Sequence, residues 1–260
     1  MIEKKTIIIT GGLGLLGKKA SYYFASKEFH VICIDISGEK KQLAENISYI
    51  NFDLTDINSY SLLIDEIKSL TNNLVCLINN AAFNPMIEGN QKDFNKFEDL
   101  DLNKWNNEMM LNLSAPVFLI KALLPIFNHT NNDYCKIINV ISTYGLVPPN
   151  QSIYESLSKK NGVEIIKPMG YPVSKAGLVM VTKYLSVYLG KNGFNINGIA
   201  PGGIENHQDQ VFIDAYSKQV PMGRMAKADE ILETLYLLAT SGSNYINGQI
   251  IAIDGGWTTW

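Results

Sequence analysis

The stretch TIIITGGLGLLG, residues 6–17, decides the fold of this chain. A β-branched run, Thr6–Thr10, is followed at once by glycines at positions 11, 14 and 17 and then by a helix-forming segment. This order predicts a buried strand, a tight turn and a helix whose free amide groups and positive dipole face an anion. The motif therefore predicts a site for the phosphates of a dinucleotide, and a merely tight turn is the alternative. The residues predicted to lie against the cofactor here are Gly11, Gly14, Leu15 and Leu16.

Short apolar runs alternate with longer helical patterns along the rest of the chain. The predicted strands are Thr6–Thr10, His30–Asp35, Ser48–Phe52, Leu74–Asn79, Lys136–Ile141, Asn195–Ala200 and Ile250–Ile253. The predicted helices are Gly14–Lys27, Tyr60–Leu70, Leu102–Phe127, Pro172–Leu189 and Ala228–Thr240. Continuous apolar runs indicate strands that are buried on both faces of a parallel sheet. The pattern predicts one α/β domain over residues 1–260, with a Rossmann-like, doubly wound parallel sheet in three α/β/α layers.

Three stretches are predicted as substrate loops, at about 82–101, 145–170 and 204–224. The first is polar and irregular, and the second contains Pro148-Pro149 among mixed polar and apolar residues. Long loops in compact domains usually carry function or are disordered. The first two follow the carboxyl ends of strands, where open α/β sheets bind ligands. His207, in the third, is interpreted as part of a mobile lid or as an ordinary surface histidine.

Composition limits the classes of partner. The chain has 260 residues, a formal net charge of −3, dispersed lysines and Arg224 as its only arginine. Neither nucleic acid nor an anionic membrane is therefore expected as a partner. No apolar run has the length of a membrane span, and the first strand begins too early for a signal peptide. The cysteines, Cys33, Cys76 and Cys135, lack metal-ligand spacing and suit a reducing compartment. The sequence predicts a cytoplasmic protein with no metal and with a small molecule as its partner.

An acidic residue, Asp35, ends the second predicted strand, 18 residues after Gly17. A carboxylate at this place can accept hydrogen bonds from both hydroxyls of an adenosine ribose and would repel a 2′-phosphate. The sequence therefore favours NAD over NADP. Two alternatives stay open: Lys18 and Lys19 lie nearby and could affect the preference, and Asp35 could be a solvated residue at a strand end.

Two further strand ends are predicted to meet the cofactor. Asp53 and Leu54 follow the third strand and are placed to meet the adenine. Asn79-Asn80-Ala81-Ala82 ends the fourth strand and brings small residues and side-chain amides beside the cofactor. Asn80, Ala81 and Ala82 are accordingly predicted cofactor contacts, and a turn-capping pair of asparagines is the alternative.

The segment Tyr171-Pro172-Val173-Ser174-Lys175 places a tyrosine and a lysine four residues apart, on one face of a helix. The spacing alone is weak evidence, because Tyr23 and Lys27 repeat it in the first helix, where we interpret them as surface residues. The second pair follows the strand that ends near Ser142, so it can return to the same cleft. A free tyrosine, with a pKa of about 10, needs nearby positive charge to act as a base near neutral pH.

Together these pieces resemble the short-chain dehydrogenase/reductase family, of the single-domain kind, over essentially the full length of the chain. The combination is far more specific than any one motif. The matching pieces are the glycine turn, Asp35, Asp53, Asn79–Ala82, Asn112, Ser142, Tyr171, Lys175, Pro201–Gly203, Tyr245–Gln249 and Asp254–Gly256.

The resemblance implies a role for each catalytic residue. Tyr171 exchanges the hydroxyl proton, Lys175 binds the nicotinamide ribose and lowers the pKa of Tyr171, and Ser142 positions the reacting oxygen. Asn112 helps to hold a water chain that runs through Lys175 to bulk solvent. The residues implied to lie against the nicotinamide are Pro201, Gly202, Gly203 and Ile204.

The glycine spacing departs from the single-domain pattern. Glycines at 11, 14 and 17 resemble the larger, two-domain nucleotide-sugar epimerases and dehydratases, and the single-domain branch usually has glycine where Leu15 stands. Only about 57 residues follow Gly203, which are too few for a separate substrate domain. The rest of the chain therefore favours the single-domain branch.

The spacing of the catalytic residues also departs from the pattern. Ser142 and Tyr171 are 29 residues apart, about twice the usual gap, which predicts an insertion at about 148–168. The insertion either caps the substrate or elaborates the surface. Tyr154 lies nearer the usual distance, but Ser158 rather than a lysine follows it by four. Asn206 stands where the family often has a threonine that bonds the nicotinamide carboxamide, and it is a candidate substitute.

Three stretches together resemble a bacterial subgroup that is associated with flagellin or surface-sugar modification: the inserted Tyr154-Glu155 region, the run Pro201–Ile204, and Phe212–Arg224. We therefore predict an NAD-dependent oxidoreductase that transfers a hydride between nicotinamide and a secondary alcohol or ketone of a sugar phosphate or nucleotide sugar. The alternatives are an epimerase or dehydratase that recycles its NAD, and a non-catalytic NAD-binding protein. The family usually forms dimers or tetramers through the two long helices, so a homodimer or homotetramer is expected.

Overall fold

The computed structural model describes residues 4–37, 44–84, 96–129 and 134–260. Within these residues the centre of the molecule is a seven-stranded parallel sheet in the order β3-β2-β1-β4-β5-β6-β7. The strands are β1 (Thr6–Thr10), β2 (His30–Asp35), β3 (Ile47–Asn51), β4 (Leu74–Asn79), β5 (Cys135–Val140), β6 (Phe194–Pro201) and β7 (Ile250–Ile253). Each predicted strand is confirmed to within one residue at either end.

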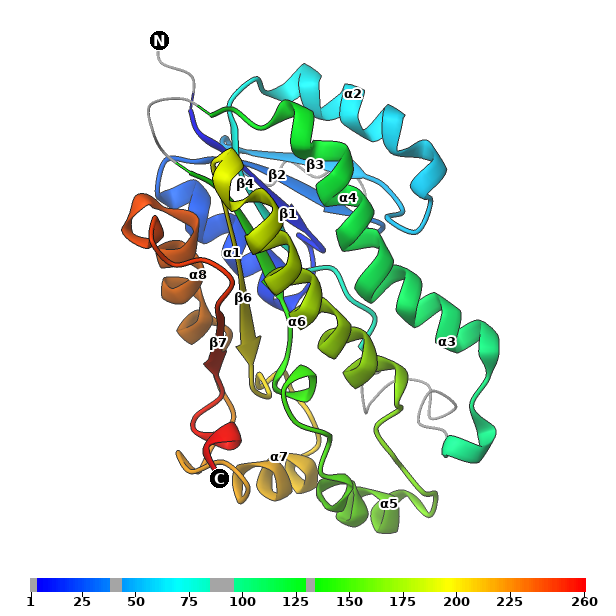
Figure 1. Ribbon diagram of the computed structural model, residues 1–260. Helices are drawn as coiled ribbons and strands as arrows, with labels where there is room; N and C mark the ends of the chain where they lie inside the picture. Colours follow the sequence, from blue (N-terminus) through cyan, green and yellow to red (C-terminus); the bar gives the residue numbers. More distant parts are fainter. Residues whose placement is uncertain (1–3, 38–43, 85–95, 130–133) are drawn as a thin grey trace.

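Helices cover both faces of the sheet (Figure 1). The helices of eight residues or more are α1 (Leu15–Ser26), α2 (Tyr60–Leu70), α3 (Leu102–Met109), α4 (Ala115–Leu123), α6 (Gly170–Leu189), α7 (Gln210–Ser217) and α8 (Leu232–Ala239). One face of the sheet packs against α1 and α8, and the other packs against α2, α4 and the end of α6. The predicted three-layer, doubly wound fold is therefore confirmed.

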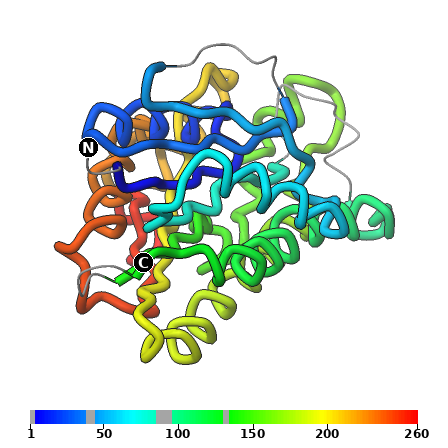
Figure 2. Tube along the Cα trace, turned by 90° about the horizontal axis from the view of Figure 1, so that it is seen from above, coloured from blue at the N-terminus to red at the C-terminus, as the bar shows by residue number. Residues whose placement is uncertain are grey.

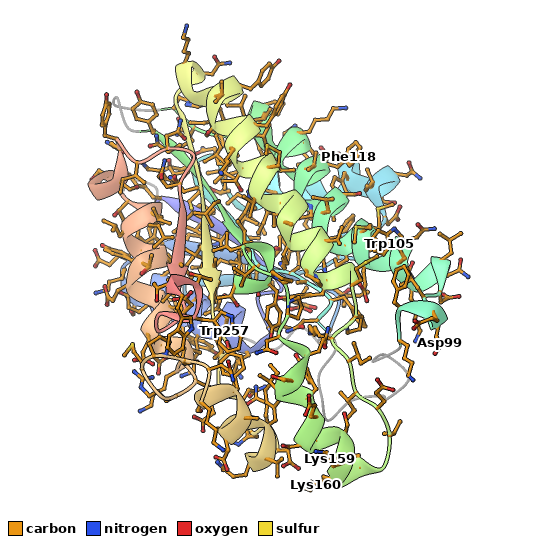
Figure 3. The ribbon with its side chains drawn as sticks, turned by 60° about the horizontal axis from the view of Figure 1, so that its bottom comes forward. Asp99, Trp105, Phe118, Lys159, Lys160 and Trp257 are labelled. Atoms are coloured by element: carbon orange, nitrogen blue, oxygen red, sulfur yellow. The ribbon has the colours of Figure 1, made fainter. Side chains whose placement is uncertain are left out.

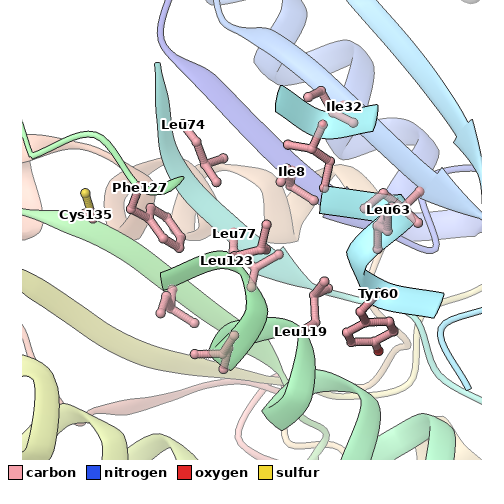
Figure 4. Packing of buried hydrophobic residues seen from close by; sticks show 14 of the residues in the cluster. Ile8, Ile32, Tyr60, Leu63, Leu74, Leu77, Leu119, Leu123, Phe127 and Cys135 are labelled. Atoms are coloured by element: carbon pink, nitrogen blue, oxygen red, sulfur yellow. The ribbon is translucent and has the colours of Figure 1, made fainter. Parts of the chain in front are cut away.

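Two apolar clusters fill the space between the layers. Figure 4 shows the first, in which Ile8, Ile32 and Leu77 of the sheet meet Leu63 of α2 and Leu119 of α4. The second cluster lies on the opposite face, between the sheet and the pair α1 and α8. The three central strands β1, β4 and β5 are buried along their whole length except for one residue, because they pack on both faces.

The order of strands reverses between β1 and β4. From β1 the chain runs outward through β2 to β3, and it then returns to β4 on the other side of β1. In an open parallel sheet, the loops on either side of such a switch point diverge and leave a crevice at the carboxyl ends of the strands. The loops after β1 and β4 are therefore the expected walls of a ligand site.

The helix predicted over Leu102–Phe127 is divided by a π-helical turn. The turn spans Met110–Ser114 and separates α3 from α4. Figure 2 shows α6 alongside this divided helix. Among the described residues, Leu102–Ile126 is the one helical stretch that is long and apolar enough to cross a membrane. Its α4 portion packs with Leu119, Ile120 and Leu123 in the core.

Two boundaries near the predicted catalytic tyrosine differ from expectation. Helix α6 begins at Gly170, so Tyr171 lies inside it and Pro172 is its third residue instead of its first. Proline is still tolerated there, because the amide groups of the first turn have no partner within the helix. The loop predicted over 145–170 contains a 3-10 turn at Gln151–Tyr154 and a short helix, α5 (Glu155–Asn161).

The inserted segment packs against the third predicted loop. Leu157 of α5 and Ile153 lie in a small apolar cluster with Phe212 of α7, and α5 and α7 lie next to each other beyond the carboxyl end of the sheet (Figure 1). Lys160 forms an ion pair with Asp209 at the start of α7. The loop predicted over 82–101 lies mostly outside the described residues, at 85–95, and Phe97–Asp99 forms a 3-10 turn.

Candidate active site

A cleft of about 640 Å³ opens at the carboxyl ends of the strands, at the switch point. Every residue predicted from the sequence to contact the cofactor lines this cleft. They are Gly11, Gly14, Leu15, Leu16, Asp35, Asp53, Leu54, Asn80, Ala81, Ala82, Tyr171, Lys175, Pro201, Gly202, Gly203 and Ile204. Of the predicted catalytic set, Ser142 also lines the cleft, whereas Asn112 does not.

The glycine turn has no room for side chains on its inner surface. Gly11 has φ +61°, a conformation that favours glycine, and a Cβ on it would lie 2.9 Å from the Cα of Ala81. A Cβ on Gly17 would lie 2.0 Å from the carbonyl oxygen of Gly11. Gly14 precedes α1, and no side chain caps the first amide groups of that helix. The turn therefore leaves backbone amides open to a phosphate, and it fits a dinucleotide.

The carboxylate of Asp35 is fixed at one end of the cleft. Its Oδ2 accepts a hydrogen bond of 3.0 Å from the amide of Leu13 in the glycine turn. Its Oδ1 accepts from the amide and the hydroxyl of Ser37, at 2.9 and 2.8 Å. These bonds orient the carboxylate without neutralising its charge, so it can still accept from the hydroxyls of a ribose.

The ends of β3 and β4 complete this half of the cleft. Asp53 Oδ1 accepts hydrogen bonds from the amide and the hydroxyl of Thr55, which hold the turn that carries Leu54. The side chain of Asn80 donates to the carbonyls of Thr10 and Gly11, at 2.9 and 3.1 Å. Asn80 therefore braces the glycine turn as well as lining the cleft, so the structural and the cofactor-contact interpretations both apply to it.

Tyr171, Ser142 and Lys175 meet at the other end of the cleft. The hydroxyl of Ser142 is hydrogen-bonded to the phenol of Tyr171. Lys175 lies one helical turn after Tyr171 on α6, and its Nζ is 5.8 Å from the centre of the tyrosine ring. The same Nζ donates a hydrogen bond of 2.8 Å to the backbone carbonyl of Val140, at the end of β5. The sheet and α6 thus bring together three residues that the sequence separates by 29 and four positions.

Burial sets the proton affinities of these groups. It raises the pKa of Tyr171 above its ordinary value, and the hydrogen bond from Ser142 opposes that rise. The resemblance implies a pKa lowered by Lys175, so the direction in the protein alone is opposite to that expectation. Burial lowers the pKa of Lys175 to about 8, which keeps a large share of it positively charged near neutral pH.

Aromatic residues form the wall around Tyr171. Tyr144, Tyr154 and Tyr216 all line the cleft, and burial raises the pKa of each, that of Tyr216 to about 12. They are therefore neutral hydrogen-bonding groups at neutral pH. The ring of Tyr216 stacks on Trp257, with centres 4.6 Å apart, and Figure 3 shows this tryptophan near α7. Trp257 is thus packed inside the protein.

Tyr154, the second sequence candidate for the acid/base, lies in this wall. Its ring packs on Phe212, and its hydroxyl is hydrogen-bonded to Tyr144. Ser158, four residues later, donates to the carbonyl of Tyr154 and supplies no charge. Tyr171 is therefore the better candidate, because it alone of the two has both a serine hydroxyl and a lysine beside it.

Asn112 lies in the π-helical turn and is fully buried. Its side chain accepts from the amide of Phe83, at 2.7 Å, and donates to the carbonyl of Phe83 and the hydroxyl of Ser174. None of these three bonds reaches Lys175. The side chain therefore anchors the loop after β4 to α6, and its implied part in a water chain stays a prediction. Irregular turns of this kind often occur at functional sites.

The stretch after β6 closes the cleft beside the tyrosines. The amide of Gly203 donates to the hydroxyl of Tyr216 at 2.5 Å, and Gln208 donates to the carbonyl of Ile204. Asn206, the candidate substitute for the family's threonine, lines the cleft. His207 has φ +60° and does not line the cleft, which favours the interpretation of it as a surface residue.

Sequence reasoning missed several residues that line the cleft. Lys167 comes from the inserted segment, Tyr144 follows Ser142 by two, and Tyr216 comes from α7. Tyr144 could have been inferred from its closeness to Ser142. Lys167 and Tyr216 gave no signal, because neither belongs to a motif and each reaches the cleft only through the packing of its segment.

The arrangement supports proton transfer to and from a substrate oxygen. Ser142 can hold that oxygen next to Tyr171, whose hydroxyl gives or takes the proton, while Lys175 supplies positive charge that favours the ionised tyrosine. A nicotinamide dinucleotide, when bound in the cleft, supplies hydride chemistry. Among the described residues, no group of three histidines, cysteines or acidic residues could hold a metal ion.

The fold and the cleft together define an oxidoreductase that uses a nicotinamide dinucleotide. A family model described as enoyl-(acyl carrier protein) reductase matches residues 15–258. The chain belongs to the short-chain dehydrogenase/reductase family, and it is an NAD(P)-dependent enzyme of that family that acts on CH–OH groups.

Its curated relatives match it from end to end. A 7alpha-hydroxysteroid dehydrogenase of Bacteroides fragilis is 28% identical, covering 98% of this chain and 95% of its own. A 2-dehydro-3-deoxy-D-gluconate 5-dehydrogenase of Escherichia coli is 27% identical, covering 98% and 96%. The post-translational flagellin modification protein A of Campylobacter coli is 24% identical, covering 99% of both chains. The range of substrates in these names leaves the substrate of this chain open.

Solved structures carry either nicotinamide cofactor. A short-chain dehydrogenase of Leptospira borgpetersenii with bound NAD⁺ has a TM-score of 0.85 and 27% identity, covering 98% of this chain and 93% of its own. ElxO with bound NADP has a TM-score of 0.81 and 25% identity, covering 99% and 100%. The likeness establishes the NAD(P) fold and does not choose between the two cofactors.

Proposed function

We propose that the chain is an NAD-dependent dehydrogenase/reductase that transfers a hydride between nicotinamide and a secondary alcohol or ketone of a sugar phosphate or a nucleotide sugar. The observation that carries the proposal is one cleft with two chemically distinct ends. The oriented carboxylate of Asp35 stands at one end, and the hydrogen-bonded pair of Ser142 and Tyr171 stands at the other.

The preference for NAD rests on charge. Asp35 would repel the 2′-phosphate of NADP. Among the described residues that line the cleft around Asp35 and Asp53, none is a lysine or an arginine. Lys19, which could have reversed this balance, forms an ion pair of 2.8 Å with Asp229, and neither it nor Lys18 lines the cleft.

Polar groups at the tyrosine end favour a substrate with many hydroxyls. Asn84, Asn206 and Gln208 line the cleft beside the aromatic wall, and amide side chains can both donate to and accept from hydroxyl groups. Two relatives bear names linked to sugar acids and to flagellin modification. These observations support a role in surface or flagellar glycan synthesis, and we place the enzyme in the cytoplasm, where buried free thiols such as Cys33 stay reduced.

The first test is a titration with NADH and NADPH, followed by cofactor fluorescence, on wild type and on Asp35→Ala. We expect NADH to bind more tightly than NADPH to the wild type, and the substitution to weaken NADH by roughly tenfold to a hundredfold, as for a charged hydrogen bond. Asp65→Ala, on the exposed side of α2, should bind as the wild type does. If the wild type bound NADPH as tightly as NADH or more tightly, the inference that Asp35 selects NAD would be wrong.

Turnover then separates the candidate reactions. Sugar phosphates and nucleotide sugars are screened for a net change in the absorbance of NADH. A dehydrogenase changes NADH in proportion to product. A recycling epimerase or dehydratase, which the glycine spacing at 11, 14 and 17 favours, forms product with no net change. Tight NADH binding with no product from the whole panel supports the non-catalytic alternative.

We also propose that the enzyme is a homodimer or homotetramer that pairs through α4 and α6. Helix α6 exposes Met180, Tyr184 and Val187, with exposed fractions of 63%, 65% and 83%, and Phe118 of α4 is 41% exposed. The partner surface is the same face of a second copy. Sedimentation of Met180→Glu should show a smaller species than the wild type, whereas Tyr245→Glu, at an exposed site elsewhere, should not. An unchanged oligomer in Met180→Glu would contradict this interface.

A further inference from the structure

A second lysine, Lys167, stands beside the catalytic tyrosine. Its side chain is buried, it lines the cleft, and its Nζ lies 4.6 Å from the centre of the Tyr171 ring, nearer than the Nζ of Lys175. It comes from the inserted segment between α5 and α6, so it belongs to no motif that we identified. Because both residues line the same cleft, this charged group borders the space in which Tyr171 would meet a substrate.

The inserted segment holds Lys167 in place. The side-chain amide of Gln151 accepts from the backbone amide of Lys167 at 2.9 Å and donates to its carbonyl at 3.1 Å. Two residues earlier, the amide of Ile165 donates to Ser158, and the side chain of Ile165 is buried in the apolar cluster with Phe212. The insertion therefore presents the lysine to the cleft from a fixed backbone.

The charge of Lys167 is incompletely balanced. An ammonium group has three hydrogens to donate, and one goes to the side-chain oxygen of Asn84. Glu108 contributes a favourable field, but this field does not offset the effect of burial, which lowers the pKa of Lys167. A buried cation with unused donors is stabilised by an anion that enters the cleft.

We propose that Lys167 binds an anionic group of the substrate, a carboxylate or a phosphate, within a few bonds of the carbon that reacts at Tyr171. The inference rests on the proposed function, because it takes Tyr171 as the acid/base. It adds to that function a charge requirement: an alcohol or ketone without an anionic group near the reacting carbon is a poor substrate. In this proposal the insertion selects the substrate by its charge.

The test measures anion binding directly, by fluorescence of NADH-saturated protein and by thermal unfolding at constant ionic strength set with chloride. The probes are inorganic phosphate and malonate. The variants are Lys167→Met, which removes the charge, and Lys159→Met, a matched control at the exposed outer end of α5 (Figure 3). We expect saturable binding of at least one probe to wild type and Lys159→Met, and binding at least about tenfold weaker to Lys167→Met.

The two probes distinguish the source of the anion. Binding of phosphate alone assigns a phosphorylated substrate, and binding of malonate alone assigns a carboxylate. Equal binding to wild type and Lys167→Met, or no binding of either probe to the wild type, overturns the proposal. The titration is repeated without NADH, so that a Lys167-dependent anion site stays measurable if the protein fails to bind the cofactor and the proposed function fails.

The pH dependence of malonate binding gives a second test of the proposal. Burial lowers the pKa of Lys167 to about 7, so malonate, which is essentially fully ionised above pH 7, should bind more weakly as the pH rises from 7 to about 8.5. The titratable groups around Lys167 are Glu108 of α3, Tyr144, Tyr171 of α6 and Lys175, and burial keeps both phenols neutral in this range. Lys175 has a pKa of about 8, so a fall in affinity that persists unchanged in Lys167→Met would assign the anion site to Lys175. Malonate affinity that is flat with pH would contradict the assignment.

Discussion

The carbonyl oxygen of Gly11 occupies the place where a side chain on Gly17 would begin. A Cβ on Gly17 would lie 2.0 Å from that oxygen and 2.8 Å from the side-chain nitrogen, Nδ2, of Asn80. The glycine turn and the first turn of α1 are therefore in contact without any side chain between them. This contact explains the third glycine of the motif, which the phosphates themselves do not require.

Gly17→Ala should consequently destabilise the protein and displace the turn that holds the cofactor. The clash involves backbone atoms, which relax poorly, so we expect a loss of roughly 1–3 kcal/mol in the free energy of unfolding and clearly weaker NADH binding. Denaturant titration and NADH fluorescence measure the two effects. Gly242→Ala is the control, since its Cβ would meet only flexible side chains at 3.3 Å or more. Equal stability of the two variants would contradict this account.

The assignment of the acid/base predicts opposite outcomes for two tyrosines. Tyr171→Phe removes the proton donor and should lower kcat by a factor of about 10²–10⁴, whereas NADH affinity, which depends on many other contacts, should change by less than about tenfold. Tyr154→Phe removes only a hydroxyl that bonds Tyr144, and it should change kcat by less than about tenfold. The measurement is steady-state turnover of the best substrate from the screen. A large loss of kcat in Tyr154→Phe alone would reverse the assignment.

Thermal stability should depend on pH through Lys167. Its pKa is about 7 in the folded protein and 10.5 in the reference state. Between these values the unfolded chain binds a proton that the folded chain lacks, so stability rises with pH and is lowest below pH 7. We expect Lys167→Met to flatten the rise of Tm between pH 7 and 8, below the range in which Lys175, whose pKa is about 8, adds a rise of its own. Lys159→Met, at an exposed site, should keep the wild-type rise of Tm with pH. If Lys167→Met also kept that rise, another group would be responsible for it.

The contact between α5 and α7 should matter for substrate more than for cofactor. Phe212 is buried and joins Tyr154 of the insertion to Tyr216 of the aromatic wall. Phe212→Ala should cost about 3–5 kcal/mol, as for other buried phenylalanines, and should raise KM for substrate with little change in NADH affinity. The control Phe97→Ala, at a residue that is 68% exposed, should change stability by less than about 1 kcal/mol. If Phe212→Ala weakened substrate binding and NADH binding equally, the claim that this contact serves the substrate more than the cofactor would be wrong.

The sequence predicted the sheet and the cofactor half of the cleft well, because both depend on local patterns. Apolar runs marked the strands, and residues at their carboxyl ends, such as Asp35 and Asp53, converge once the strands are parallel. The Tyr171–Lys175 pair was found for the same reason, since a spacing of four fixes one face of a helix.

The substrate half was predicted poorly, because it is built by contacts between distant segments. The region around Glu155 was expected to be a loop, and its helix is stabilised by packing on α7, which no local pattern reveals. No sequence pattern distinguishes Lys167 from the other lysines, because it comes to lie beside Tyr171 only when the chain folds. The side-chain contacts of Asn112 with Phe83 and Ser174 likewise depend on three segments that meet only in the fold.

The π-helical turn at Met110–Ser114 has a consequence for how this enzyme can vary in length. A π turn holds about one residue more than an α turn, so deleting one residue there could leave a regular, continuous helix. Each α-helical residue turns the axis by about 100° and each π-helical residue turns it by less, so the deletion would leave α3 and α4 in nearly the same relative orientation. Glu108 would then keep its place against Gly170, where a Cβ would clash with it, whereas Asn112 lies within the turn that is lost. A single deletion that the helix tolerates would thus keep the acidic side chain beside Lys167 and remove the bonds by which Asn112 joins Phe83 to Ser174.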